Sequence, residues 1–287
     1  MKIRFTIRNI TFCAIVVIGL ILFCYWQNNH IVITGAKYSN PRIPKEFAGY
    51  VIAHISDLHN KEFGKKQEKL LNKLKRTSPD IIVITGDLVD RRKYDLNKAM
   101  RFVKGAVKIA PVYYVSGNHE AWSNQYETIR SRLEEAGVQV LDDSAAELLI
   151  GGSSIRLLGL SDPDFLTSRY RDGTDTSRVE ECLRQWSGEE GFQILLSHRP
   201  ELFDRYAEYP VDLVFSGHAH GGQFRLPFVR RGLIAPDQGL FPKYTSGSYT
   251  KNGTTMFVSR GLGNSILPIR IFNRPEIVVV SLEHNAS

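Results

Sequence analysis

The chain has 287 residues, of which 43% are hydrophobic and 23% charged, and its formal net charge is +7. This composition is that of an ordinary globular protein, long enough for one large α/β domain or two small domains, and it excludes an intrinsically disordered chain. No internal repeat and no low-complexity segment occurs, which excludes a solenoid. No basic stripe interleaved with aromatic residues stands out, so we expect no nucleic acid partner.

The first predicted element is a transmembrane anchor over residues 10–27. Ile10 to Trp26 reads ITFCAIVVIGLILFCYW, which is uncharged and almost wholly apolar, and its length approaches the ~20 residues that a bilayer core requires. Residues 1–9 form a basic flank, which the positive-inside rule places in the cytoplasm, so we expect the bulk of the chain on the extracytoplasmic side of the cell membrane. No small-residue cleavage site follows the run, which favours an uncleaved anchor over a signal peptide.

Residues 28–48 are expected to form a linker and residues 49–287 the folded domain. Near the start of this domain, residues 61–76 (KEFGKKQEKLLNKLKR) are the densest charge run of the chain. Leucines at helical spacing within the run predict a helix that packs on a sheet. We therefore favour a solvated helix face over a binding patch for these charges.

From residue 50 onward, short β-rich apolar runs each stop at a cluster of Asp, Asn or His. The runs are Tyr50–Ser56, Ile81–Thr85, Val112–Val115, Phe192–Leu196 and Val211–Phe215. Helical patterns lie between several of them, for instance at 64–76 and Tyr126–Ala136, and this alternation predicts a largely parallel sheet. Ligands gather outside the carboxyl ends of such strands, so we expect the clusters to share one rim. A hairpin signal at Ile150–Leu160 suggests the continuation of a second sheet.

Together the clusters offer a mixed set of oxygen and nitrogen donors, namely Asp57, His59, Asp87, Asn118, His198, His218 and His220. Taken singly, each has an ordinary explanation, because Asp and Asn form turns and helix caps and a strand-end His is usually satisfied by hydrogen bonds. Five of the eight histidines fall in the clusters, however, and independent turns have no reason to share that placement. The donor set suits Mn, Fe or Zn.

The ordered motifs resemble the calcineurin-like metallophosphoesterase superfamily. They are Asp57-x-His59, Gly86-Asp87-x-x-Asp90, Gly117-Asn118-His119-Glu120, His198 and Gly217-His218-x-His220. The match spans residues 50 to about 220. Later stretches, including residues 221–223, 259–263 and 274–277, resemble the membrane-associated bacterial branch of YaeI/YkuE type, which implies a phosphodiesterase. The resemblance implies an α/β fold, a four-layer αββα sandwich, here with an amino-terminal transmembrane helix.

The resemblance also implies two divalent metal ions, with Mn favoured over Fe and Zn. One ion would be bound by Asp57, His59, Asp87 and His220, and the other by Asp87, Asn118, His198 and His218. Asp87 would bridge them, and the pair would turn water into hydroxide for attack at phosphorus. We expect His218 and His220 to point the same way, as alternate residues of an extended segment do.

Four further residues are candidates for catalysis or substrate binding. His119 would protonate the leaving group, and Asp90 would orient His119 and raise its pKa, although Asp90 could equally be a solvated loop carboxylate. Arg91 lies where related phosphatases carry a phosphate-binding Arg, but Arg92 replaces the glycine that usually follows. Arg199 could either grip phosphate or form a surface ion pair.

We therefore expect a metal-dependent hydrolase of phosphomonoesters or phosphodiesters, acting on a lipid-linked or cell-envelope substrate. One alternative is a pyrophosphatase of UDP-diacylglucosamine type. Another is a non-enzymatic, metal-stabilised binding protein tethered to the membrane. The aromatic residues of Phe224–Tyr249 either form a wall for an amphipathic substrate or pack a long loop onto the core.

Overall fold

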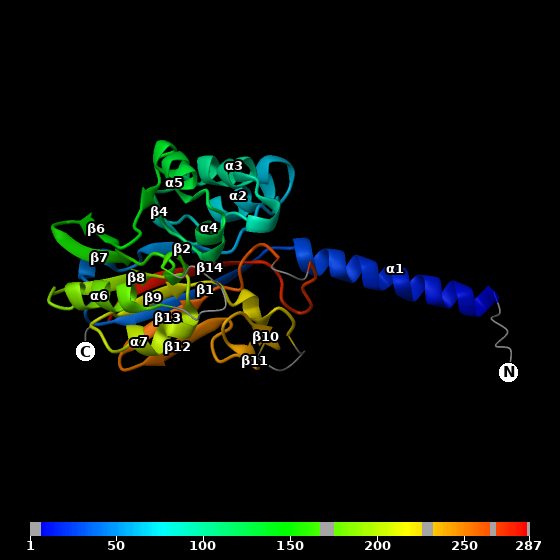
Figure 1. The fold of residues 1–287 in the computed structure, drawn as a ribbon. Helices are drawn as coiled ribbons and strands as arrows, with labels where there is room; N and C mark the ends of the chain where they lie inside the picture. The colour runs from blue at the N-terminus through cyan, green and yellow to red at the C-terminus, as the bar shows by residue number, and fades with distance from the viewer. Residues whose placement is uncertain (1–6, 167–174, 226–231, 265–267, 286–287) are drawn as a thin grey trace.

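The computed structural model describes residues 7–166, 175–225, 232–264 and 268–285. Within these residues two six-stranded sheets pack face to face (Figure 1). The first sheet contains, in spatial order, β1 (Val32–Asn40), β14 (Glu276–His284), β2 (Val51–Ile55), β3 (Ile81–Thr85), β4 (Val112–Val115) and β5 (Gln139–Val140). The second contains β12 (Gly247–Lys251), β13 (Thr254–Val258), β9 (Leu213–Ser216), β8 (Phe192–Leu196), β7 (Ser153–Gly159) and β6 (Ser144–Ile150).

Helices cover the outer face of each sheet, which completes four layers. Over the first sheet lie α2 (Glu68–Lys75), α3 (Leu96–Ala106) and α5 (Tyr126–Glu135), and over the second lie α6 (Ser177–Trp186) and α7 (Phe203–Tyr206) (Figure 1). The short α4 (Asn118–Trp122) follows β4 at the edge of the first sheet. A small hairpin of β10 (Ile234–Ala235) and β11 (Gly239–Leu240) stands apart from both sheets. The expected αββα sandwich is thus confirmed, and the β6–β7 hairpin continues the second sheet.

Separate apolar cores hold the four layers together. The core under the helices of the first sheet contains Leu70, Leu74, Phe102 and Ile129, which pack on Ile55 and Ile84. The core between the two sheets contains Val83, Tyr113, Ile194 and Phe215. The core under α6 contains Val179, Leu183 and Trp186, which pack on Leu195 and Val214. Strands β3 and β8 are buried along their whole length. Strands covered on both faces need near-continuous apolar runs, which is why these segments were recognisable.

The charged run at residues 61–76 forms a helix, as predicted, but a shorter one. Lys66 and Gln67 have positive φ angles of 54° and 67°, so regular α2 begins only at Glu68. Leu70 and Leu74 are fully buried while the basic residues of α2 point away from the core.

Residues 28–48 differ from the expected linker. They contain β1, which pairs in parallel with β14 from Val32↔Glu276 to Asn40↔His284, and a 3₁₀ turn whose Phe47 is fully buried. The pairing partner lies at the far end of the sequence, so no local pattern announced this strand. The folded domain therefore begins at Val32 instead of residue 49.

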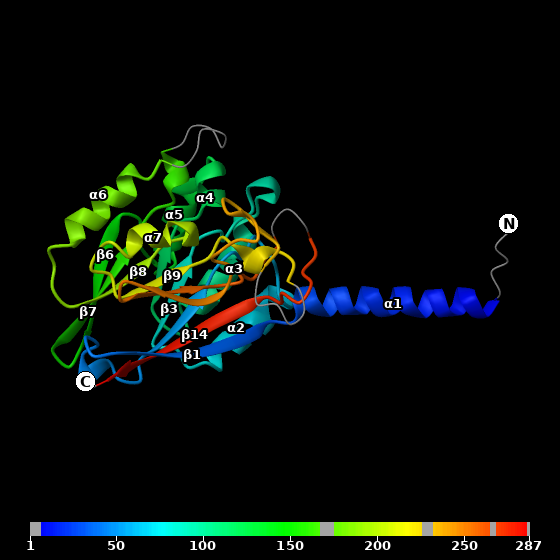
Figure 2. The ribbon, with the colours of Figure 1, turned by 90° about the horizontal axis from the view of Figure 1, so that it is seen from below.

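Helix α1 (Ile7–Asn29) projects away from the rest of the molecule (Figures 1 and 2). Its segment Arg8–Asn29 has the length and composition of a single membrane span, and none of its most apolar 18-residue window is buried in the protein. Near the domain end of the helix, Gln27 is buried. Twenty-three residues of α-helix extend roughly 35 Å, enough for a hydrocarbon core of about 30 Å. Residues 1–6 of the basic flank lie outside the described part of the chain.

The strand register places the domain end of α1 at the same edge of the sheet as the carboxyl ends of β2, β3 and β4, which lead into predicted ligands. Strand β1 starts opposite Glu276, at the amino end of β14. Strand β14 runs antiparallel to β2, with Val278 opposite His54, so Glu276 also lies beside the carboxyl end of β2. Strands β3 and β4 run parallel to β2 and end at this edge.

Candidate metal centre

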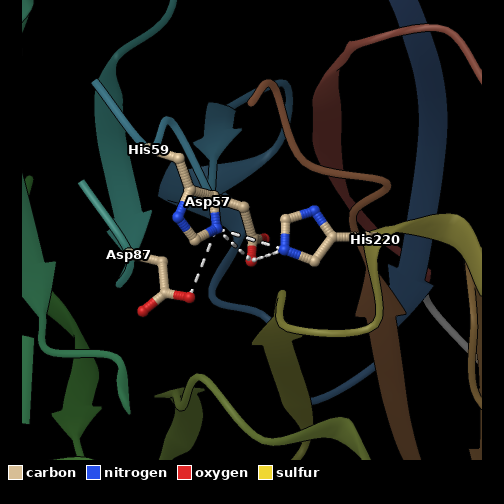
Figure 3. A group of neighbouring side chains, drawn as sticks. All are labelled: Asp57, His59, Asp87 and His220. Atoms are coloured by element: carbon tan, nitrogen blue, oxygen red, sulfur yellow. Dashed lines mark hydrogen bonds and ion pairs between the residues drawn. The ribbon is translucent and has the colours of Figure 1, made fainter. Parts of the chain in front are cut away.

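The predicted ligands converge in two groups between the carboxyl ends of the strands. In the first group Asp57, His59, Asp87 and His220 each offer a donor atom within 4.8 Å of the others (Figure 3). The Nε2 atom of His59 lies 3.1 Å from Nε2 of His220 and 3.4 Å from Oδ2 of Asp87. The Nε2 atom of His220 lies 3.3 Å from Oδ1 of Asp57.

The second group shares Asp87 with the first. Its Oδ2 atom, close to His59, is also 3.3 Å from Nε2 of His198. Around that same nitrogen lie Oδ1 of Asn118 at 3.0 Å and Nδ1 of His218 at 3.1 Å. All the predicted ligand positions are thus brought together, with the Asp87 carboxylate between the two groups.

Most of these residues have a positive φ angle, a backbone conformation that residues other than glycine rarely adopt. The φ angles are 53° for Asp57, 47° for His59, 54° for Asp87, 61° for His218 and 46° for His220. Such conformations cost roughly 1–3 kcal/mol each and persist where function requires them. The prediction that His218 and His220 lie on an extended segment and point the same way was wrong. A tight turn separates them, so the His218 ring belongs to the second group and the His220 ring to the first.

Two glycines allow the loops to approach the carboxylates. A Cβ atom at Gly217 would lie 1.8 Å from Oγ of Ser56 and 2.5 Å from Oδ2 of Asp57. At Gly117 it would lie 2.4 Å from Oδ1 of Asp87. Any side chain at these positions would displace a predicted ligand.

Polar groups outside the ligand set fix the orientation of the ligands. The Nδ1 atom of His198 lies 2.7 Å from the carbonyl oxygen of Thr85, and Nε2 of His218 lies 2.8 Å from Oδ2 of Asp237. Each imidazole donates its proton to the oxygen, so the other nitrogen faces the site with a free lone pair. Sequence reasoning missed Asp237, since it lies in a hairpin turn that carries no motif.

Glu120 is a second residue whose role the sequence did not reveal. Its buried carboxylate accepts hydrogen bonds from the backbone N–H groups of Asp87 and Gly117, both at 2.8 Å, and from that of Val89 at 3.1 Å. It thereby ties the loop after β3 to the loop after β4, which positions Asp87 against Asn118.

The charge states of His59 and His220 suit cation binding, whereas His198 must first lose a proton. Burial, with the nearby His119, lowers the pKa of His59 to about 3, and burial, with the nearby His59, holds the pKa of His220 well below its usual range. Both rings are therefore neutral donors. Burial alone would lower the pKa of His198, but the Asp87 carboxylate outweighs it and raises this pKa to about 10. A cation must displace that proton, and the set of neutral imidazoles and carboxylates fits a divalent transition metal.

His119 lies beside the first group. Its ring contacts His59 edge-on, with ring centroids 4.5 Å apart, and its backbone N–H donates to Oδ1 of Asp87 at 2.8 Å. The backbone N–H of Arg91 donates to Nδ1 of His119 at 3.2 Å. The proton of the neutral ring is therefore on Nε2.

Asp90 does not form the expected hydrogen bond with His119. Its Oδ1 atom is 3.7 Å from Nδ1 of His119, too far for a hydrogen bond, while its carboxylate binds the guanidinium of Arg92 at 3.0 and 3.1 Å. Burial lowers the pKa of His119 despite the nearby Asp87 and Asp90, opposite to the expected rise. Arg91 is exposed, and its guanidinium lies 4.5 Å from the ring centre of Trp122.

Arg199 is buried, contrary to the surface ion pair considered for it. Its guanidinium binds Asp162 through Nε at 2.7 Å, Asp164 through Nη2 at 2.7 Å and Asp237 through Nη1 at 2.6 Å. Nη1 also lies 3.3 Å from Nε2 of His218. These carboxylates occupy the donors that a phosphate would need.

The aromatic stretch of Phe224–Tyr249 divides between the two roles considered for it. Tyr244 packs edge-on against Phe203 of α7 and against Tyr249, with ring centroids 5.5 and 5.0 Å apart, so these tyrosines anchor the loop. Phe241 is 66% exposed beside Leu240, which is 73% exposed. Phe228 lies outside the described residues.

The sequence pattern of the family described as calcineurin-like phosphoesterase matches residues 50–222, more than half of the chain. The chain therefore belongs to the calcineurin-like metallophosphoesterase family. Together with the converging Asp, Asn and His donors, this membership identifies a metal-dependent phosphoester hydrolase.

Particular relatives extend the match beyond the family pattern. The metallophosphoesterase YkuE of Bacillus subtilis is 31% identical over 267 residues, covering 90% of this chain and 88% of the relative. The UDP-2,3-diacylglucosamine pyrophosphatase LpxG of Chlamydia muridarum is 27% identical, with 83% and 86% covered. The crystal structure of TT1561 of Thermus thermophilus has a TM-score of 0.50 at 13% identity, covering 74% of this chain and 90% of that one, and it supports the fold alone.

Proposed function

We propose that this hydrolase cleaves a phosphomonoester or phosphodiester carried by a membrane lipid or a cell-envelope precursor, with the catalytic domain on the extracytoplasmic side. The observation that carries the proposal is the shared sheet edge: β1 begins where β2 ends. Because α1 leads directly into β1, the metal centre opens on the side of the domain from which the apolar helix projects.

An exposed apolar tip beside the centre supports an amphipathic substrate. The β10–β11 hairpin that carries Asp237 also exposes Ile234, Leu240 and Phe241, at 46%, 73% and 66%. Asp237 binds the predicted ligand His218, so these side chains stand close to the reaction. An apolar surface at the mouth of a phosphate site suits a substrate that has acyl chains.

The residues divide the chemical work among them. Two divalent cations held by Asp57, His59, Asp87, Asn118, His198, His218 and His220 would lower the pKa of water and neutralise phosphate oxygens. His119 would direct its Nε2–H at the leaving oxygen, because the Arg91 amide faces its other nitrogen, and in its imidazolium form it would protonate that oxygen and return to a neutral ring. Arg91, exposed on the ring of Trp122, would bind the phosphate. Asp90 would hold Arg92 and the loop that supplies this amide.

A pyrophosphatase reaction on a molecule of UDP-diacylglucosamine type is the second candidate, and the similarity to LpxG favours it. That substrate also combines a phosphate linkage with acyl chains, so the same site features suit it. The non-enzymatic alternative is disfavoured, because the ligand set is complete and His119 lies beside it.

The test is metal analysis of the purified chain followed by a substrate panel with a lipid phosphodiester, a phosphomonoester and a nucleotide-sugar diphosphate. We expect Mn-stimulated turnover of the lipid ester. His119→Ala should reduce kcat roughly 10²–10⁴-fold with unchanged metal content. Full activity of the variant contradicts the acid assignment, and preference for the nucleotide-sugar diphosphate selects the second candidate.

Protease treatment of intact cells tests the orientation. An extracytoplasmic domain is digested without lysis, whereas protection until lysis contradicts that placement.

A further inference from the structure

A pocket lies where α1 meets the folded domain, away from the metal centre. Its volume is about 410 Å³. Its walls come from Tyr25 and Trp26 in the last turns of α1, from His30 just after the helix, and from Lys69, Lys73 and Arg76 of the α2 region. It shares no residue with the metal centre, so it is a separate candidate binding site.

The pocket concentrates basic side chains that form no ion pair with any described residue. Within the described residues no acidic side chain lines it, and Lys69, Lys73 and Arg76 form no ion pair. Some basic residues elsewhere have carboxylate partners, such as Lys251 with Asp204 at 2.7 Å, whereas those of the pocket are gathered around a hollow without one. Unpaired cations around a concave site indicate an anionic ligand.

An additional cation reinforces the rim of the pocket. The guanidinium of Arg274 lies 4.6 Å from the ring centre of Trp26, and its Nη1 atom lies 3.2 Å from Nδ1 of His30. It brings the loop before β14 against α1, where Phe272 also meets Phe23 with ring centroids 5.6 Å apart.

The position of the pocket along α1 identifies the anion. Trp26 and Tyr25 stand at the domain end of the apolar helix, 44% and 68% exposed. Aromatic residues in such places lie at the headgroup level of a bilayer, and adjacent Lys and Arg side chains attract anionic lipids. The pocket therefore combines cations for a phosphate with an apolar wall that continues into the membrane span.

We propose that the pocket of Tyr25, Trp26, Lys69, Lys73 and Arg76 binds the phosphate headgroup of an anionic phospholipid. The lipid occupies this site as a ligand and not as the substrate. Its phosphate is held between α2 and the end of α1, which joins the anchor to the charged helix that was expected to face only solvent.

The test measures, by native mass spectrometry, how much lipid the full chain retains in an uncharged detergent. Retention of phosphatidylglycerol is compared with retention of phosphatidylcholine. The parent should retain phosphatidylglycerol in preference to phosphatidylcholine. The variant Lys69→Gln/Lys73→Gln/Arg76→Gln should retain at least roughly tenfold less phosphatidylglycerol than the parent. The matched control Lys75→Gln/Lys104→Gln/Lys108→Gln removes the same charge outside the pocket and should behave as the parent.

A single-residue pair, Lys73→Gln against Lys75→Gln on the same helix, repeats the comparison with minimal change to the fold. Equal loss in both triple variants, or equal retention of the two lipids by the parent, overturns the proposal. Glycerol 1-phosphate separates the two sources of phosphate. If it displaces phosphatidylglycerol at similar concentration, free phosphate is the ligand and the lipid assignment is wrong.

Discussion

Asp237 accepts a hydrogen bond from Nε2 of His218 across 2.8 Å, while Nδ1 of the same ring faces His198 at 3.1 Å. This hydrogen bond and the Arg199 guanidinium lower the pKa of Asp237 to about 2. The β10–β11 hairpin thus holds a carboxylate whose charge selects the tautomer of a predicted ligand.

Replacing this carboxylate should weaken one half of the metal centre. Asp237→Ala removes the acceptor that fixes His218, and loss of such a partner typically costs 10–100-fold in metal affinity. Metal bound per chain at limiting Mn should fall accordingly. Asp237→Asn keeps an acceptor oxygen and should recover part of the affinity, and the exposed Asp204→Ala is the control. Unchanged affinity in Asp237→Ala contradicts the positioning role.

Gly217 should not tolerate even a methyl group. The Cβ of Gly217→Ala meets Ser56 and Asp57 at 1.8 and 2.5 Å, so the loop before His218 must shift. We expect loss of bound metal and a decrease in unfolding free energy of about 1–3 kcal/mol. Gly188→Ala, which meets nothing within 4 Å, should stay within about 0.5 kcal/mol of the parent. Normal metal content in Gly217→Ala contradicts the close packing.

Asp142 should make stability depend on pH. Burial raises its pKa to about 6 from 3.8, although the Tyr126 hydroxyl and the Ser116 N–H donate to it. Because the folded state favours the protonated carboxyl, this group contributes stability that is fully present below the unfolded-state pKa of 3.8 and is lost as the pH rises through 6. The expected loss between pH 4 and 7 is at most about 3 kcal/mol.

Denaturant unfolding of metal-free Asp142→Asn and parent at several pH values measures this effect. The variant should gain stability relative to the parent as pH rises from 4 to 7. Asp204→Asn should show a smaller trend of opposite sign, because the Lys251 ammonium lowers the pKa of this exposed Asp204. A pH-independent difference between Asp142→Asn and parent rules out the assignment.

Metal removal should destabilise the whole sandwich. The donor atoms come from loops of both sheets, so ions that bind them link the two halves in the folded state only. At a concentration of 100 times Kd, each ion adds about 2.7 kcal/mol. Thermal unfolding with and without chelator should therefore differ by several degrees in the parent and far less in Asp87→Ala. Equal chelator effects in both chains contradict the bridging role of Asp87.

Much of this molecule was predictable because its central strands are buried on both faces. Strands β3, β4 and β8 occupy the expected residues, and each leads into an expected ligand. What escaped prediction depends on distant partners. Strand β1 is stabilised by β14 at the other end of the chain, and Asp237 meets His218 through a hairpin that carries no family motif.

The backbone of the ligand loops was also beyond reach. The spacing of His218 and His220 suggested alternation along a strand, whereas positive φ angles at both residues turn the rings toward different groups. Likewise the position of Arg199 beside His198 allowed either a phosphate contact or a surface ion pair, and only the folded chain reveals the buried carboxylates that surround it.

Only His30 and Ile31 separate the membrane helix from β1, which is hydrogen-bonded to β14 along its length. The catalytic domain therefore has no flexible tether on which to swing toward distant substrates. Where the apolar helix spans a membrane, as proposed, the reaction centre would stay at a fixed height above the lipid surface. For a membrane-borne ester, the length of the headgroup then becomes a selection rule, since only bonds that project to that height reach the cutting position.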